Sequence, residues 1–263
     1  RGDVLDAMDL DAVDELEDPA DRAFEQVAAQ DPCGGGGDRE GRDAAQREAA
    51  VIARRLETIA TLTRVYADET GRALATPATD VTADQKAAYA YAEDGAFYTT
   101  RDTGGSAVFY TGVVPIGPAE QDKVWRTTRL DPIMKSIVTA DPLITQVYLN
   151  THDSLNRIYP YFDVLGIYPP KMDIPSYNFY YEADAVHNPG RGVVWTDAYV
   201  DPAGAGWMVS AIAPVYGADD TDRLDAVVGL DITTNTIVDQ VLDIAFKGDG
   251  YAILVSRDGT ILA

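Results

Sequence analysis

The sequence has little cysteine, little histidine and no long hydrophobic run. Its one cysteine, Cys33, cannot form an intrachain disulfide framework. His152 and His187 have no second histidine or cysteine at metal-ligand spacing, so we expect neither a metal site nor another cofactor. No apolar run approaches the roughly 20 residues that a membrane helix needs. Any membrane contact is therefore expected through segments outside these 263 residues.

Basic residues are also scarce, with 21 lysines and arginines against 43 aspartates and glutamates and a net charge of −22. Such a surface repels phosphate backbones, which argues against nucleic acid as a partner. The sequence lacks a Gly-x-Ser-x-Gly elbow, a His-Glu-x-x-His motif and a phosphate-binding glycine loop. We therefore expect a protein that is not an enzyme. The content of 46% hydrophobic and 24% charged residues is typical of a globular protein.

The first 71 residues contain two predicted segments. Residues 1–41 are strongly acidic and end near four consecutive glycines, Gly34–Gly37, which predict a flexible arm. Residues 42–71 predict one long helix that ends near Gly71. This helix suits packing on the chain's own sheet and also the pairing of two chains in a homodimer. Its apolar stripe, at spacings of three and four, comprises Ala45, Ala49, Ile52, Leu56, Ile59, Leu62 and Tyr66.

The remaining residues predict a sheet covered by helices. Residues 72–118 show no regular pattern, and Pro118 begins a helix expected to reach about residue 139, with an interruption at Pro132. An α+β fold with an antiparallel sheet has this order of elements. The other predicted helices are 177–184 and 234–246, and the predicted strands are 143–150, 155–161, 193–200, 208–216, 225–232 and 251–256.

Three strand motifs stand out in the second half of the sequence. They are Trp195–Asp201 with its Trp-x-x-x-Tyr-x-Asp pattern, Ser210–Tyr216 with Pro-Val-Tyr, and Val227–Ile232 with Val-x-Gly-x-Asp. Together they resemble the Cache family of extracellular sensor domains, which have a PAS-like antiparallel sheet. The last residues, 250–263, are similar to the opening of a second module. The resemblance covers about residues 42–263. It implies a double-Cache arrangement, with a membrane-distal module at 72–246 and the start of a membrane-proximal module at 247–263.

The resemblance implies a sensor. Domains of this family lie in the periplasm or outside the cell, as parts of membrane-anchored histidine kinases and chemoreceptors that respond to small molecules. In the amino-acid-binding branch, an Arg-x-Trp motif holds the ligand carboxylate, and Tyr177 and Phe179 stand at those positions here. Tyr199, Asp201 and Asp231 match the residues that hold the ammonium. Because no guanidinium is present to pair with a carboxylate, we expect a small polar metabolite that is cationic or neutral.

Asp231 is also singled out by the strand pattern. Alternation places Val227, Gly229 and Asp231 on one face of a strand, and Gly229 leaves space for a ligand beside the carboxylate. A carboxylate between apolar strands is costly to bury unless a partner pairs with it. The alternative is a structural role, with Asp231 as the N-cap of the helix that starts near Thr233.

Aromatic residues are dense between positions 148 and 207 and complete the candidate site. An aromatic cage beside two aspartates would attract an ammonium group by a cation–π interaction. The alternative is that these rings pack in an ordinary core. The candidate ligand-binding residues are Tyr148, Tyr177, Phe179, Tyr181, Trp195, Tyr199, Asp201 and Asp231.

Three functions remain open on these grounds. The first is a sensor in which ligand binding shifts the strands against the helix at 42–71, which carries the change toward a membrane. The second is a structural or protein-interaction module of the same fold that takes no small ligand. The third is an acidic hydrolase, which requires two convergent carboxylates in a cleft, one of them with a raised pKa. The surroundings of Asp201 and Asp231 discriminate among the three.

Overall fold

The computed structural model describes residues 26–30, 39–78, 81–217, 223–241 and 251–255, and these form two antiparallel sheets. The larger sheet has nine strands in the order β2-β3-β4-β6-β5-β10-β9-β7, and β8 also pairs with β9. The smaller sheet pairs β1 (Gln26–Gln30) with β11 (Tyr251–Val255). The strands of the large sheet are β2 (Tyr89–Tyr91), β3 (Phe97–Thr99), β4 (Ala107–Tyr110), β5 (Gln146–Thr151), β6 (Leu155–Tyr159), β7 (Val194–Trp195), β8 (Tyr199–Val200), β9 (Trp207–Tyr216) and β10 (Leu224–Thr233).

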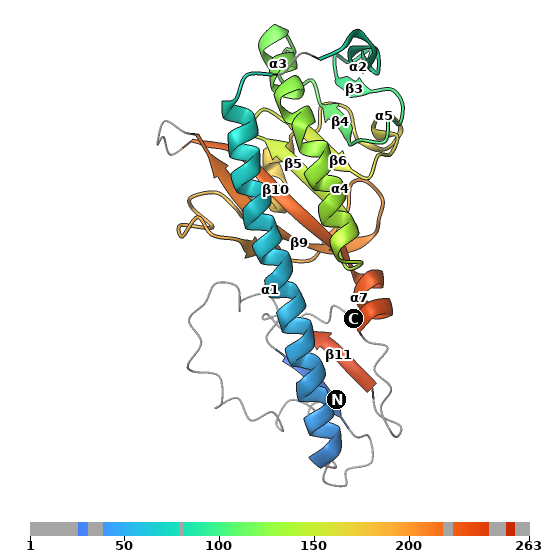
Figure 1. Cartoon of the computed structure of the whole chain (residues 1–263), viewed down its shortest axis with the longest axis vertical. Helices are drawn as coiled ribbons and strands as arrows, with labels where there is room; N and C mark the ends of the chain where they lie inside the picture. Colours follow the sequence, from blue (N-terminus) through green and yellow to red (C-terminus); the bar gives the residue numbers. More distant parts are fainter. Residues whose placement is uncertain (1–25, 31–38, 79–80, 218–222, 242–250, 256–263) are drawn as a thin grey trace.

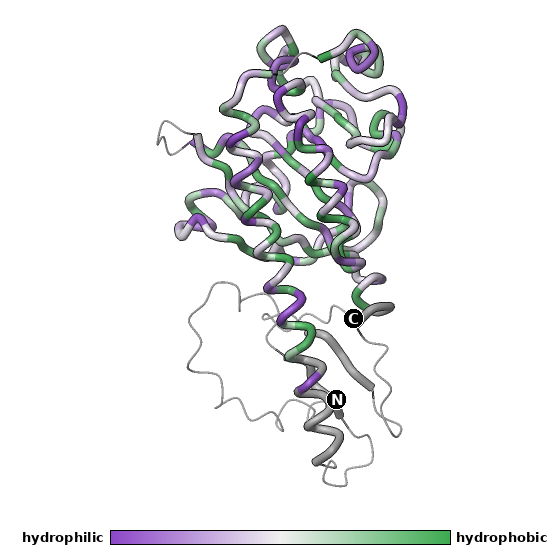
Figure 2. Tube along the Cα trace, in the orientation of Figure 1, coloured by the Kyte–Doolittle hydropathy of each residue, from purple (hydrophilic) through white to green (hydrophobic). Residues whose placement is uncertain are grey.

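Helices cover one face of the large sheet. The longest, α1, crosses it beside α4, and α3 lies beyond the end of α4 (Figure 1). Hydrophobic and hydrophilic residues are interleaved along the described part of α1, as Figure 2 shows, and this is the pattern of a helix with one buried stripe. The helices are α1 (Arg39–Ala75), α2 (Ala83–Lys86), α3 (Pro118–Thr127), α4 (Asp131–Ala140), α5 (Val164–Ile167), α6 (Asn178–Tyr181) and α7 (Thr234–Val241), with the short 3-10 helices η3 (Thr128–Leu130) and η4 (Ile174–Ser176).

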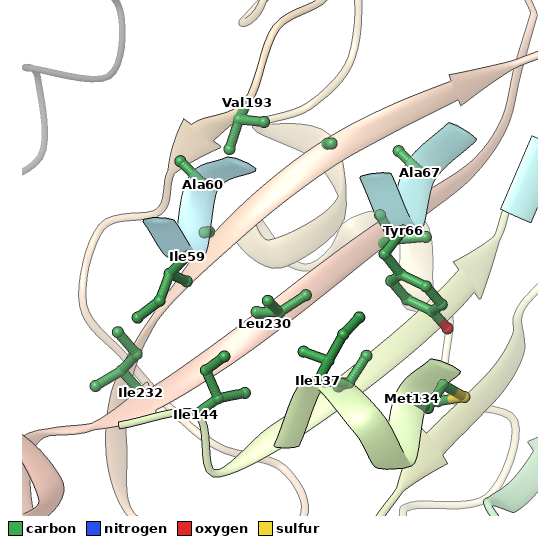
Figure 3. Packing of buried hydrophobic residues seen from close by; sticks show 14 of the residues in the cluster. Ile59, Ala60, Tyr66, Ala67, Met134, Ile137, Ile144, Val193, Leu230 and Ile232 are labelled. Atoms are coloured by element: carbon green, nitrogen blue, oxygen red, sulfur yellow. The ribbon is translucent and has the colours of Figure 1, made fainter. Parts of the chain in front are cut away.

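The main core lies between the helices and the sheet. Ile59 of α1 and Leu230 and Ile232 of β10 are fully buried there, and Met134 and Ile137 of α4 join the same cluster (Figure 3). Burial of such a side chain contributes about 1.5–3 kcal/mol. The stripe predicted for the long helix therefore packs on the chain's own sheet.

A second core lies on the opposite face of the sheet. It contains Phe109 of β4, Tyr148 of β5, Ile158 of β6 and Val227 of β10, together with residues of the segment that follows β6. Side chains alternate between the two faces of a strand, so each central strand contributes to both cores. The expected α+β architecture, a long helix followed by an antiparallel sheet, is confirmed.

The long helix is longer than predicted. It begins three residues before 42 and continues past Gly71 to Ala75. Gly71 does not end the helix; it lies where α1 approaches β9, and a Cβ at this glycine would be 3.6 Å from Val215. No helix in the described ranges is long and apolar enough to cross a membrane.

Other elements also differ from the predictions. Strands β2, β3 and β4 lie in the segment 72–118, where no strand was predicted, because strands of three or four residues are too short to show a clear alternation. The predicted strand 193–200 is two short strands, β7 and β8. Strand β1 lies within the segment expected to be a flexible arm. Residues 1–25, 31–38, 242–250 and 256–263, on which the arm and second-module predictions also rest, lie outside the described residues.

Candidate functional site

A pocket lies on the sheet face opposite α1. Its cavity is small, about 20 Å³, which is enough space for roughly one water molecule, and it is partly open to solvent. Strands β5, β6 and β10 contribute to its floor, and residues of η4 and α6 close one side. Its lining residues are Phe109, Tyr148, Asn150, Asn156, Ile158, Tyr168, Met172, Ile174, Phe179, Tyr199, Asp201, Pro202 and Asp231.

The strand register brings the polar residues of the pocket together. Asp231 pairs with Ser210 of β9, and Gly229 pairs with Tyr148 of β5. Alternation along β10 turns Val227 toward the pocket-side core and its neighbours toward the helices, as predicted from the sequence. Asp231 therefore stands on the pocket face, with its carboxylate directed away from α1.

Asp231 is a buried acid, only 2% exposed. The Ser210 hydroxyl donates a hydrogen bond to its Oδ1 at 2.5 Å, and the Tyr199 hydroxyl donates to the same oxygen at 3.4 Å. Loss of solvent raises the pKa of Asp231 to about 8, and the charge of Asp201 adds to this effect, while the two hydrogen bonds oppose it. At neutral pH the carboxyl therefore holds its proton for much of the time, unless a cation arrives.

The predicted alternative, in which Asp231 caps the following helix, is wrong. The backbone N–H of Thr236 donates to the Thr233 hydroxyl at 3.1 Å, so Thr233 is the N-cap of α7. Asp231 lies two residues earlier, inside β10, where its side chain points into the pocket rather than along the helix axis. Asp231 therefore does not cap α7.

Asp201 lines the pocket and also stabilises a turn. Its Oδ1 accepts from the Ala203 N–H at 2.9 Å and its Oδ2 from the Ala205 N–H at 3.0 Å, and these bonds hold the turn between β8 and β9. Burial raises the pKa of Asp201, and the two backbone hydrogen bonds oppose that rise. Each carboxylate oxygen accepts more than one hydrogen bond, so the turn leaves Asp201 capacity toward a ligand.

Aromatic rings surround the two acids. The Phe179 ring lies 5.3 Å from that of Tyr199 and 6.0 Å from that of Tyr148, measured between centroids. The Tyr148 hydroxyl donates to the Phe179 carbonyl at 3.2 Å, which ties α6 to the floor of the pocket. Rings at these distances can bind a cation with their faces. The cation loses its water on entering the pocket, and acceptors such as Asp231 take the place of that water.

Five of the eight predicted residues line the pocket: Tyr148, Phe179, Tyr199, Asp201 and Asp231. Tyr177 does not line it but stacks on Phe179, with ring centroids 5.1 Å apart.

Two predicted residues lie elsewhere. Tyr181 is 38% exposed and packs against His187, because on the single turn of α6 it points away from the inward side of Phe179. Trp195 packs against the core on the helix side of the sheet, since it pairs with Ala211, which faces the helices. Neither side chain reaches the pocket.

A pair of carboxamides in the pocket was missed. Asn150 and Asn156 pair across β5 and β6, and the Asn156 Nδ2 donates to the Asn150 Oδ1 at 2.8 Å. The signal was present in the sequence, because alternation puts Asn150 on the same face as Tyr148. The sequence alone did not mark Asn156 as a pocket residue, because only the register between β5 and β6 places Asn156 beside Asn150.

The described residues that line the pocket include no lysine, arginine or histidine. The same residues offer acceptors in two carboxylates and two carboxamides. In the part of the chain that the structure describes, no group of three or more histidine, cysteine, aspartate or glutamate side chains is placed to hold a metal ion. The arrangement is suited to a ligand that donates hydrogen bonds and carries positive charge.

The space above Gly229 is filled by the protein itself. A Cβ on this glycine would collide with Cζ and the hydroxyl oxygen of Tyr148, so the glycine admits the tyrosine ring, not a ligand as the sequence suggested. We expect Gly229→Ala to destabilise the fold by about 2 kcal/mol, as overpacking does, and to displace the ring. Urea unfolding measures the first effect. Gly190→Ala is the control, because a Cβ at Gly190 meets nothing within 4 Å. Equal stability of the two variants would mean that Tyr148 does not occupy this space.

Comparison with known proteins gives structural similarity only. No protein-family model matches the sequence. The ligand-binding domain of the Pseudomonas aeruginosa amino acid chemoreceptor PctC, in complex with GABA, is similar over 85% of this chain and 73% of its own, at 18% identity and a TM-score of 0.49. The ligand-binding domain of the Campylobacter jejuni chemoreceptor Tlp3, in complex with 4-methylisoleucine, is similar over 86% of this chain and 68% of its own, at 12% identity and a TM-score of 0.48. The ligand-binding domain of the P. aeruginosa amino acid chemoreceptor PctB, in complex with L-Arg, is similar over 56% of this chain and 53% of its own, at 24% identity and a TM-score of 0.40.

Proposed function

We propose that this chain is the extracytoplasmic sensing region of a transmembrane receptor of the double-Cache type, and that its pocket binds a small amine. The observation that carries the proposal is the buried carboxylate of Asp231, which shares an aromatic pocket with Asp201 while the described lining residues supply no cation. A buried carboxylate is stable as an ion only when a positive group pairs with it. An ammonium group fills that role and also meets the faces of the surrounding rings.

The chemoreceptor domains named above are in complex with amino acids, and we infer a different preference here. A ligand carboxylate placed beside Asp201 and Asp231 would meet like charge, with no lysine, arginine or histidine among the described lining residues to offset it. The net charge of −22 also attracts cations and repels anions at longer range. Simple amines are therefore favoured over amino acids and carboxylic acids.

Two elements connect the pocket to the rest of the chain. Asp231 lies in β10 between Leu230 and Ile232, whose side chains pack on the opposite face against the core that contains α1. A displacement of β10 on ligand binding is therefore felt by α1, and by α7, which begins three residues after Asp231. A signal requires that the ligand bind one of two states of this unit more tightly than the other. We propose that the signal from this sensing region controls a kinase or a chemotaxis pathway.

Pairing of two chains through α1 is part of the proposal. Val51 and Val65 of this helix are 54% and 50% exposed, on a face away from the sheet. Their spacing of four turns would place them along one seam between two helices. A homodimer joined there would couple the two α1 helices directly.

The affinity for an amine is expected to rise with pH. Binding requires the ionised form of Asp231, whose pKa lies at about 8 in the free protein. The dissociation constant should therefore be on the order of 100-fold larger at pH 6 than at pH 9, with a plateau above the pKa. Isothermal titration calorimetry with n-alkylamines, which stay protonated over this range, measures the effect. Proton release on binding, seen in buffers of different ionisation enthalpy, should accompany it below pH 8.

A panel of amines, amino acids and carboxylates in a thermal-shift assay tests the ligand class. A ligand at 100 times its dissociation constant adds about 2.7 kcal/mol to the free energy of unfolding, a shift of several degrees. Hits confined to carboxylates would contradict the charge argument. No hit in the panel would favour the second function, a structural or protein-interaction module, for which the turn held by Asp201 is the supporting observation.

The hydrolase hypothesis is less well supported. Two carboxylates do converge in one pocket, and the pKa of Asp231 is raised. A hydrolytic pair needs a second carboxylate that is free to act as base or nucleophile. Both oxygens of Asp201 instead accept backbone N–H groups of their own turn, which suits a binding pocket better.

A further inference from the structure

A second cavity lies beside helices α3 and α4 and is much larger than the pocket that contains Asp231. It encloses about 590 Å³, which is in the usual range for a small-molecule site. The described residues that line it all differ from those that line the Asp231 pocket. They come from α2, β2, the loop between β3 and β4, α3 and α4. Helices α2 and α3 lie at the top of the molecule in Figure 1.

One side of this cavity is built from polar groups that pair with one another. The Asp131 Oδ1 accepts a hydrogen bond from the Ser106 hydroxyl at 2.5 Å and one from Nη1 of Arg157 at 3.2 Å. Gly105 packs directly on this carboxylate, since a Cβ at the glycine would collide with Asp131 Oδ2. The fully buried guanidinium of Arg157 offsets the charge of Asp131. Asp131 therefore adds little repulsion toward an anion in the cavity.

Two aromatic rings give the cavity an apolar wall. Tyr89 of β2 and Trp125 of α3 both line it, with ring centroids 5.0 Å apart and an interplanar angle of 86°. Both side chains are half-buried, so part of each ring is accessible. A flat apolar group can pack on such rings in a stacked or an edge-to-face arrangement.

Two cations line the same cavity, Arg101 from the loop after β3 and Lys135 of α4. In the described part of the chain neither side chain forms an ion pair. The Arg101 Nη1 donates to the Ala87 carbonyl at 3.2 Å, which leaves the other N–H groups of the guanidinium for a ligand. Asp84 is the other charged residue among the described lining residues besides Asp131. The cavity thus has a positive balance in a protein of net charge −22.

We propose that this cavity is a second ligand site, which binds small aromatic carboxylates. The ligand carboxylate pairs with Arg101 and Lys135, and the ligand ring packs on Trp125 and Tyr89. This preference is opposite in charge to that of the Asp231 pocket, whose described lining residues supply no cation. The inference does not rest on the proposed amine-binding function, because the two cavities use different residues.

Calorimetry with benzoate and with benzyl alcohol tests the charge preference. Benzyl alcohol keeps the ring and lacks the carboxylate, so we expect benzoate to bind about tenfold more tightly through its two charge-assisted contacts. Arg101→Gln and Lys135→Gln should each lower this ratio to about threefold. Lys86→Gln is the matched control and should keep the full ratio, because Lys86 is an exposed lysine of α2 that does not line the cavity.

The indole N–H signals in an NMR spectrum locate the bound ligand. Trp125→Phe assigns one of the three tryptophan signals to Trp125, and benzoate should shift this signal and leave those of Trp195 and Trp207 in place. A Trp125 signal that does not respond to benzoate would overturn the inference. Equal affinity for benzoate and benzyl alcohol, or an unchanged ratio in both cavity variants, would also overturn it. Asp231→Asn should bind benzoate as the wild type does, so failure of either site is distinguishable from failure of the other.

Discussion

Asp231→Asn is expected to abolish amine binding and, at the same time, to make the ligand-free protein more stable at pH 8. Removal of a buried charge that pairs with a ligand cation should weaken binding on the order of 100-fold or more. The asparagine keeps an oxygen that can accept from Ser210, so the fold loses little. Weaker amine binding together with higher stability of the ligand-free protein would indicate that the Asp231 carboxylate binds the ligand and destabilises the free protein.

The stability gain depends on pH. The pKa of Asp231 is about 8 in the folded chain, against about 3.9 in an unfolded one. Between these values the folded state holds one more proton than the unfolded state, so the contribution of Asp231 to stability is present at low pH and is lost as the pH rises toward 8. Asparagine does not titrate. The difference in melting temperature between Asp231→Asn and the wild type should therefore be small near pH 4 and largest at pH 8 and above.

Asp225→Asn is the matched control. Asp225 lies on the same strand, is partly exposed and pairs with Arg223 at 2.7 Å, outside the pocket. Calorimetry and thermal melts of both variants over pH 4–9 give the full comparison. Amine affinity within threefold of wild type in Asp231→Asn would rule out this carboxylate as the cation partner. A lower melting temperature at pH 8 would instead assign it a structural role.

Arg157→Met is expected to destabilise the fold by about 3 kcal/mol without changing amine affinity. Arg157 of β6 is fully buried on the helix side of the sheet. Its guanidinium donates to the Ser106 hydroxyl at 2.7 Å and to the Val124 carbonyl at 2.9 Å, and it forms an ion pair with Asp131 at 3.2 Å. These bonds join β6 to the loop before β4, to α3 and to α4, so the loss of one side chain leaves several buried groups unpaired.

Urea unfolding, followed by circular dichroism, measures this effect. Arg55→Met is the matched control, since Arg55 pairs with Asp141 at 2.6 Å but is partly exposed, and a pair in contact with water is worth below about 1 kcal/mol. If the two methionine variants lose the same small stability, the network around Arg157 is dispensable. A change in amine affinity in Arg157→Met would show that the helix side of the sheet communicates with the pocket.

Periodicity in the sequence determined a large part of the fold. The spacing of apolar residues from Ile52 to Tyr66 specified a long helix with one buried stripe, because such a stripe can be buried on only one side. Alternation along β10 specified that Val227 and Asp231 face away from Leu230 and Ile232. Both patterns are local, and local patterns survive in any tertiary context that keeps the helix or strand. Tyr199, Asp201 and Asp231 became candidates through the resemblance of their motifs to the Cache family, and all three line the pocket.

Contacts between distant strands were decided only by the tertiary structure. Trp195 and Tyr199 looked equivalent in the sequence, but the pairing of Trp195 with Ala211 turned the tryptophan to the helix side. Asn156 entered the pocket through the register of β5 with β6. Register depends on turns and on packing that no short segment encodes by itself, and a shift of one residue exchanges the two faces of a strand.

The electrostatic character of the pocket has the same origin. The sequence supplies Asp231 as an acid of ordinary strength, and only its burial, together with the charge of Asp201, raises its pKa to about 8, against the opposing hydrogen bonds from Ser210 and Tyr199. The sequence by itself therefore determined the layers, the long helix and the face on which the acids stand. The tertiary structure decided which aromatic rings reach them and how strongly the acids hold their protons, because these depend on the solvent excluded by residues far apart in the chain.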